Sequence, residues 1–161
     1  MQDFYRAGQH KDGDTTRSIH LAYPFVLSTR DMARLGYLML RDGNWNGKQL
    51  VPRTWVRLTT RLVTPNADLH PASWSAGARP TGYGWLWWVE ERPDTADALH
   101  GAYSARGAFG QYIWVIPKLD MVVAHKVVIR RGTPSGTFVS DRDMKRILDA
   151  LIAAHCSTRC H

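Results

Sequence analysis

The sequence predicts an α+β domain in which helices flank an antiparallel sheet. Its 161 residues are 44% hydrophobic, enough for one globular domain with a buried core. Two segments, at 28–43 and 140–155, carry apolar residues at helical spacing. Several β-rich runs follow one another between them, from residue 83 to 130. Strands that are grouped, rather than alternating with helices, favour an antiparallel sheet with helices packed on it.

The first predicted helix is "STRDMARLGYLMLRDG". Ser28 is a favourable N-cap, and Asp31 three positions later completes a capping box. Gly43 provides the C-terminal stop. One face of the helix is apolar, with Met32, Leu35, Leu38 and Met39.

A second, shorter helix is expected after a tight turn at Asn46-Gly47. It begins at Pro52, a residue tolerated in the first helical turn, and carries Trp55 and Val56. Residues 1–24 show no periodicity and are expected to be irregular. Because both of these helices fall before residue 64, residues 1–63 form the helical part of the chain. Residues 64–82 contain three prolines and many small residues, and we expect a long loop there.

Four strands are predicted next: "YGWLWWVE" from residue 83, then 98–104, 110–116 and 121–129. The turn "PKLD" joins the last two. Their nearly continuous apolar character indicates that both faces of the sheet are covered. The final helix begins after Ser140, with Asp143 completing its cap. Its predicted apolar stripe is Met144, Ile147, Leu148, Leu151 and Ile152.

Charge and composition exclude several classes of function. The net charge is +7, but Lys and Arg are scattered, which favours a basic surface over a nucleic-acid interface. No apolar stretch approaches the roughly 20 residues of a membrane span. The N-terminus lacks the features of a signal peptide, so a cytoplasmic location is the default expectation; a periplasmic or secreted one stays open for a longer form.

The C-terminal "HCSTRCH" superficially suggests a metal site. Cys156 and Cys160, with His155 and His161, lie in a tail after a helix and lack the usual zinc-ligand spacing. We therefore expect two spare thiols, with no metal and no cofactor.

No complete catalytic set is present among the common motifs. There is no G-x-S-x-G, none of the eight serines starts an S-x-x-K, and no Tyr starts a Y-x-N. His100 and His125 fall on predicted strands, where a structural polar role is the more frequent one.

Three stretches resemble the serine β-lactamase-related family, which includes class C β-lactamases, family VIII esterases, D-aminopeptidases and 6-aminohexanoate-dimer hydrolases. They are "LSTRDMARLGYLMLRDGNWNGKQLVPRTWV", "YGWLWWV" and "GAFGQYIWVIPKLDMVVAHK", in the family's order, within roughly residues 22–155. The residues that match in the first stretch are Ser28, Asp31, Ala33, Arg34, Gly36, Gly43, Trp45, Gly47, Leu50, Val51, Trp55 and Val56.

The resemblance implies an incomplete β-lactamase/transpeptidase-like fold: a single partial domain over 1–161, with parts at 1–63, 64–82, 83–130 and 140–155. In the family, the nucleophile Ser and its Lys (S-x-x-K) and the Tyr (Y-x-N) precede the region seen here. The chain would then be the C-terminal part of a serine hydrolase that acts by acyl transfer on an ester, amide or β-lactam-like substrate, and it would be inactive alone. The alternative is a non-catalytic binding module derived from the same fold.

The resemblance also places the family's third motif, K-T-G, near Ala102-Tyr103-Ser104. The second oxyanion-hole N–H would come from near Ala105, and small residues through Gly107 would let a substrate approach the strand.

Ala102 stands where the family's cation would be, which leans away from β-lactamase activity and toward esterase, amidase or peptidase chemistry. Arg106 could supply positive charge or be an exposed strand-end residue. Tyr103 and Trp74 are either substrate contacts or packing residues. The expected partner is a small ester or amide, with no nucleic acid and no membrane. The chain would self-associate or pack against a missing N-terminal half.

Overall fold

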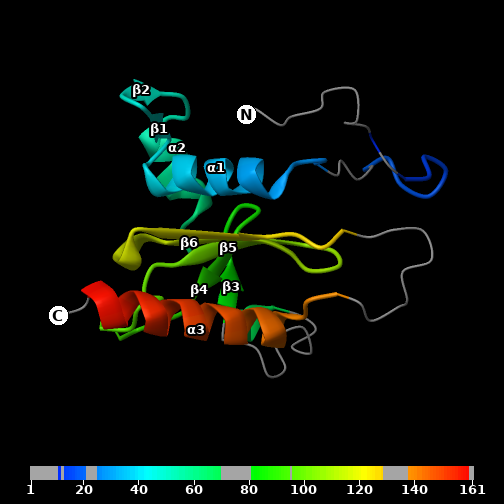
Figure 1. Ribbon diagram of the computed structural model, residues 1–161. Helices are drawn as coiled ribbons and strands as arrows, with labels where there is room; N and C mark the ends of the chain where they lie inside the picture. The colour runs from blue at the N-terminus through cyan, green and yellow to red at the C-terminus, as the bar shows by residue number, and fades with distance from the viewer. Residues whose placement is uncertain are drawn as a thin grey trace.

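A computed structural model describes residues 11, 13–20, 25–69, 81–94, 96–128 and 138–159. At its centre is a five-stranded antiparallel sheet in which chain order and strand order agree (Figure 1). The strands are β3 (Thr81–Tyr83), β4 (Trp88–Glu90), β5 (Tyr103–Gly107), β6 (Gln111–Ile116) and β7 (Met121–His125). The predicted α+β class with an antiparallel sheet is confirmed.

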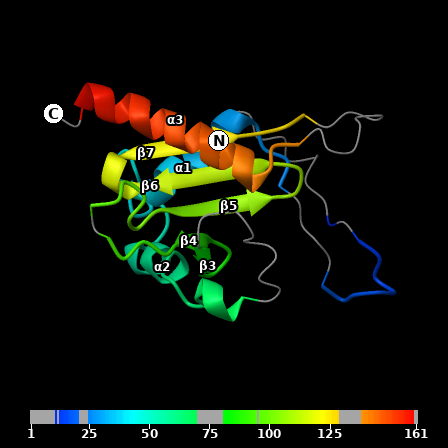
Figure 2. The same ribbon diagram turned by 90° about the horizontal axis from the view of Figure 1, so that it is seen from below.

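Helices cover both faces of this sheet. Helix α1 (Thr29–Leu40) lies on one face and α3 (Asp141–Arg159) on the other (Figures 1 and 2). Strand β6 serves both cores because its side chains alternate between the faces. Ile113 joins the cluster around α1, whereas Trp114 joins the cluster that holds Met144 and Leu148 of α3. The prediction that both faces are covered is confirmed.

The predicted helix caps are present. The Oγ of Ser28 accepts a hydrogen bond from the N–H of Asp31 at 3.1 Å. The Oγ of Ser140 accepts from the N–H of Asp143 at 3.2 Å, and the N–H of Ser140 donates to the carboxylate of Asp143 at 3.3 Å, which together form a full capping box. Beyond α1, Gly43 has φ +81° and donates to the carbonyl of Leu38, so it is the C-terminal stop that the sequence predicts.

Strands β1 (Asn44–Trp45) and β2 (Lys48–Gln49) form a hairpin around the predicted tight turn. Asn46 and Gly47 both have positive φ, as a type I′ turn requires. Helix α2 (Arg53–Thr59) then begins directly after Pro52, one residue later than predicted. Val56 is buried, and Trp55 lies half exposed on the outer side.

The apolar stripe predicted for α3 is narrower than expected. Met144 and Leu148 are buried against the sheet. Ile147 and Leu151 are 37% and 40% exposed, which contradicts the prediction for these two residues. A helix on an open sheet buries the side chains that point at the sheet and leaves neighbouring positions at its flank.

The stretch "YGWLWWVE" is a hairpin, and the prediction of a single strand is wrong. The chain reverses between β3 and β4, where Leu86 has φ +70° and the N–H of Gly84 donates to the carbonyl of Trp87. β3 also begins at Thr81, inside the predicted loop 64–82. Residues 70–80 of that loop, with Trp74, lie outside the described residues; before them, Asn66–Asp68 forms one 3-10 turn.

The strand predicted at 98–104 is also wrong over most of its length, because β5 begins only at Tyr103. Two aspartates fold the preceding segment into turns: Asp94 accepts from the N–H of Ala96, and Asp97 from the N–H of Leu99. The next two predicted strands are present as β6 and β7, but β7 ends at His125, and residues 126–128 of the predicted strand 121–129 lie outside it. Within the described residues, no helix combines the length and the apolar character needed to cross a bilayer.

Candidate functional site

Strand β5 is paired on both sides along only half of its length. β4 lies opposite its first residues, with Trp88 facing Ser104 and Val89 facing Tyr103. The N–H of Glu90 extends this pairing by donating to the carbonyl of Ala102 at 2.9 Å. Residues 105–107 pair with β6, but no described strand lies along their other side. This open half of β5 is the candidate site.

The register decides which backbone groups point out of the open half. Along a strand, the polar groups of successive residues point to opposite sides. Ala102 and Ser104 direct theirs toward β4, so Arg106 directs its N–H and C=O to the same, here unpaired, side. Ala105 faces β6 across from Ile113. The oxyanion assignment to Ala105 stays a prediction, and the register favours its neighbour Arg106 as the outward donor.

The turn between β5 and β6 explains one of the glycines, Gly110. Phe109 and Gly110 both have positive φ, 65° and 87°. A Cβ on Gly110 would lie 2.7 Å from the carbonyl oxygen of Val139, so this position needs glycine for close approach as well as for φ. The ring Nδ1 of His125 lies 2.8 Å from the carbonyl oxygen of Gly110. The end of the turn is therefore fixed by the segment before α3 and by β7.

The side chain of Arg106 is enclosed on the α3 face of the sheet and is 13% exposed. Its guanidinium carbon lies 5.3 Å from the ring centre of Trp88 and 5.2 Å from that of Trp114. Its Nε donates to the Oγ of Ser104 at 3.0 Å, and its Nη1 to the carboxylate of Asp141 at 3.3 Å. The alternative of an exposed strand-end arginine is therefore wrong, because two indoles and α3 cover it.

Two further groups complete this cluster. Oε1 of Glu90, a residue almost fully buried, lies 3.7 Å from Nη2 of Arg106, an ion-pair distance. The hydroxyl of Tyr112 lies 2.8 Å from the carboxylate of Asp141 and 3.0 Å from the carbonyl oxygen of Val139, so its single proton is shared between these two acceptors. Burial, and then the adjacent Asp141 carboxylate, raise the pKa of Tyr112 well above its usual value. Tyr112 therefore stays neutral and ties β6 to the first residue of α3.

The residues at the predicted K-T-G positions are buried in this structure. Ala102 and Ser104 have no exposed surface, and Tyr103 is 6% exposed. The Tyr103 ring packs edge-on against Trp87 at 5.2 Å, in the core below α1. Burial, and then the charge of Asp42, raise the pKa of Tyr103 well above its usual value. Of the two roles considered for Tyr103, the geometry favours packing.

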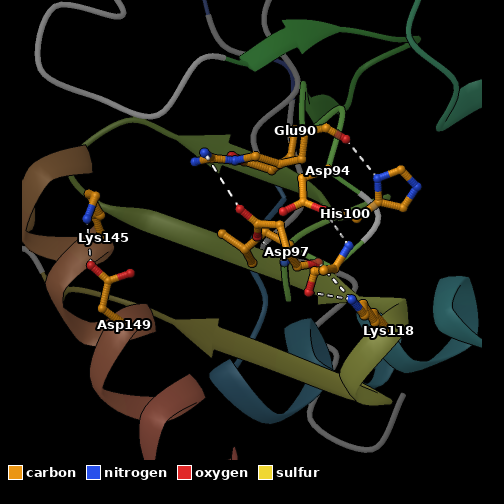
Figure 3. A network of polar contacts seen from close by, with 10 residues as sticks. Glu90, Asp94, Asp97, His100, Lys118, Lys145 and Asp149 are labelled. Carbon is orange, nitrogen blue, oxygen red and sulfur yellow. Dashed lines mark hydrogen bonds and ion pairs between the residues drawn. The ribbon is translucent and has the colours of Figure 1, made fainter.

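A second polar network, which shares Glu90 with the cluster around Arg106, holds the loop before β5 (Figure 3). His100 places Nδ1 2.7 Å from the carbonyl of Arg92, and Arg92 pairs with Glu90 and Asp97. Lys118 donates to the carbonyl of Ala96 at 2.6 Å. These contacts agree with a structural role for His100. The same view shows Lys145 and Asp149 of α3 pairing apart from this network.

No cluster of three or more His, Cys, Asp or Glu suited to a metal occurs among the described residues. Cys160 and His161 of the terminal "HCSTRCH" lie outside those residues, and the Cys156 side chain is not described. The partners of Arg106 did not follow from the sequence. Trp88 and Trp114 lie across from Ser104 on the two neighbouring strands, and this pairing can be predicted only when the strand boundaries are correct.

Comparison with known proteins supports the resemblance. The family model described as Beta-lactamase matches residues 4–144. An uncharacterised protein of Alkalihalophilus pseudofirmus is 30% identical over 118 residues, which cover 68% of this chain and 32% of that protein. A putative 6-aminohexanoate-dimer hydrolase from Bacillus anthracis has a similar structure, with a TM-score of 0.53 and 23% identity, over 86% of this chain and 30% of the other. The chain thus spans about a third of the length of these relatives, and it belongs to the β-lactamase family, with the corresponding α+β fold.

Proposed function

We propose that this chain is the C-terminal part of a serine hydrolase domain and that the open half of β5 is one wall of its acyl-transfer site. The observation that carries the proposal is the unpaired edge at residues 105–107, where Arg106 directs a backbone N–H outward in a member of the β-lactamase family. An extended substrate can bind such an edge by adding a strand. An outward N–H can also stabilise the oxyanion of a tetrahedral intermediate.

The nucleophile and its proton-transfer partners would come from outside this chain. Acyl transfer in the family needs a Ser activated by Lys and Tyr, and S-x-x-K and Y-x-N do not occur in these 161 residues. The isolated chain therefore supplies binding and oxyanion stabilisation but no attacking group, and we expect no turnover from it.

The chemistry of the edge supports a small ester or amide without a carboxylate at the recognition position. Ala102 offers no charge there. The guanidinium of Arg106 is held on the α3 face by Asp141 and the two indoles, away from the open edge. A substrate carboxylate would lose the hydration of its charge with no cation to replace it.

A fluorophosphonate probe, which labels an activated serine, tests whether the nucleophile comes from outside this chain. The isolated chain should remain unlabelled, both when native and after heat denaturation. A chain extended at its N-terminus by segments carrying S-x-x-K and Y-x-N should be labelled only when native. Labelling of the native 161-residue chain would contradict the absence of a nucleophile. An extended, folded chain that resists the probe would contradict the hydrolase proposal and favour the non-catalytic binding module.

The substrate class is tested on the same extended chain. We expect a higher kcat/KM for p-nitrophenyl acetate than for nitrocefin, whose carboxylate requires a cation. A preference for nitrocefin in the unmodified protein would overturn the proposed substrate class.

A further inference from the structure

Arg106 combines a buried, multiply bonded side chain with a backbone N–H on an open strand edge. The side chain contacts residues of β4, β6 and α3 through Trp88, Trp114 and Asp141. The N–H points to the side of β5 that β4 leaves uncovered. Both groups branch from one Cα, so immobilising the side chain restricts the backbone at the same residue.

We infer that Arg106 is a positioning residue whose caged side chain fixes the direction of its own backbone N–H on the open half of β5. The inference rests on the proposed function, in which this N–H is the donor to the oxyanion. The cage is a polar cluster around one guanidinium: two indole faces, the Ser104 hydroxyl and the carboxylates of Glu90 and Asp141. A planar guanidinium suits stacking between rings together with hydrogen bonds in its plane.

The end of β5 needs a restraint of this kind because it lacks a second described strand as a partner. Up to Ser104 the strand has neighbours on both sides, but among the described strands residues 105–107 pair with β6 alone. A strand end with one partner frays more easily, and the β5–β6 turn follows immediately. Oxyanion stabilisation requires a donor that does not reorient during the reaction. The side chain of Arg106 supplies, through Trp88, Glu90 and Asp141, the restraint that backbone pairing with β4 does not supply.

Tyr112 strengthens this restraint from the neighbouring strand. It lies directly across from Arg106 in the register. Both side chains bind Asp141, one at 3.3 Å through the guanidinium and the other at 2.8 Å through the hydroxyl. The first residue of α3 is therefore fastened to β5 and β6 at adjacent positions. Motion of the open half relative to the sheet would have to break contacts on both strands.

The test measures the order parameter of the backbone amide at position 106 in the 161-residue chain. In the unmodified protein it should be about 0.85, as for rigid backbone, and in Arg106→Ala it should fall below about 0.6. In Arg106→Ala, guanidinium chloride at millimolar concentration, far below the concentrations that unfold proteins, should bind where the Arg106 guanidinium was and restore the order parameter. Urea at the same concentration should not, because it carries no charge. Trp88 and Trp114 report the binding of guanidinium through their fluorescence.

Arg41→Ala is the matched control, because Arg41 also combines an aromatic contact with a carboxylate, at Tyr37 and Asp120. This variant should leave the amide at 106 unchanged. If Arg106→Ala does not fold, Arg106→Lys keeps the charge but loses the planar stacking, and it should give a smaller fall of the same order parameter.

The outcomes separate this inference from the proposed function, because backbone order does not depend on turnover. An unchanged order parameter in folded Arg106→Ala or Arg106→Lys overturns the inference, even if the extended chain hydrolyses esters. A fall that guanidinium does not reverse also overturns it, since the effect would then be general loosening. A fall that is reversed, in a protein whose extended form resists fluorophosphonate, supports the cage and overturns the proposed function alone.

Discussion

Helix α1 approaches the sheet so closely at Gly36 that a side chain there would meet β6 and β7, and replacing Gly36 with alanine tests how tightly this interface is packed. An added Cβ would lie 2.6 Å from Cγ1 of Val122 and 2.9 Å from Cγ2 of Ile113. Ordinary carbon contacts are about 3.5–4.0 Å, so these methyl groups must retreat by roughly half an ångström to one ångström. Both belong to β-branched side chains, which have few alternative rotamers.

Two effects of opposite sign compete in Gly36→Ala. In an exposed helix, the exchange stabilises by about 1 kcal/mol through helix propensity. Overpacking a core costs about 1–3 kcal/mol. The two short distances involve branch methyls, one of them on the buried Ile113, so we expect the packing cost to win. The predicted net destabilisation is about 1 kcal/mol in urea unfolding at equilibrium.

A double-mutant cycle assigns this loss to the contact. Val122→Ala removes the methyl group nearest the new Cβ, so the double variant should lose less stability than the sum of the single variants, by about 1 kcal/mol. The reasoning is refuted if Gly36→Ala stabilises the protein, or if the two substitutions are additive. Either result would mean that α1 can move away from the sheet at no cost.

Three other predictions concern a buried leucine, two buried tyrosines and a helix cap. Leu148→Ala removes a fully buried side chain and should destabilise by about 2–5 kcal/mol in urea unfolding; a loss below 1 kcal/mol would mean that α3 is not tightly packed. The pKa values of Tyr103 and Tyr112 are raised in the folded state, so their contribution to stability is complete below the unfolded pKa near 10 and is lost as the pH rises further; absorbance titration should show both ionising only with unfolding, and ionisation near pH 10 in the folded protein would contradict this. Ser140→Ala removes the hydroxyl hydrogen bond that contributes most to lowering the pKa of Asp143 but keeps the backbone one, so that pKa should move part of the way up toward its ordinary value in a carboxylate NMR titration, whereas an unchanged pKa would argue against the capping box.

The parts of the fold that the sequence predicted correctly depend on short-range rules. The cap at Ser28, the stop at Gly43 and the turn at Asn46-Gly47 each follow from the chemistry of one or two residues. Two of the failures, the missed hairpin in "YGWLWWVE" and the late start of β5, have local causes too. Leu86 takes a positive φ that leucine rarely adopts, so nothing in its identity marks the reversal between β3 and β4. Asp97 forms a turn inside a segment whose apolar content indicates a strand.

The candidate site was predictable only as a region. The glycine-rich turn after β5 drew attention to the correct hairpin, but the choice of outward-facing residue depends on register. A shift of one residue exchanges both the face of each side chain and the side of each N–H. The cage around Arg106 joins residues from β4, β6 and α3, and their meeting depends on the tertiary fold.

The agreement between strand order and chain order has a consequence for synthesis on the ribosome. Each strand of the sheet finds its partner already made when it emerges, because β3 to β7 pair only with the preceding or following strand. Helix α1 is the exception. It contacts the five-stranded sheet mainly through β6 and β7, which are made after α2, β3, β4 and β5. The apolar side chains of α1, among them Met32 and Met39, therefore stay uncovered while most of the sheet is translated. During that interval, α1 is the segment of the nascent chain that a chaperone for exposed apolar helices would bind.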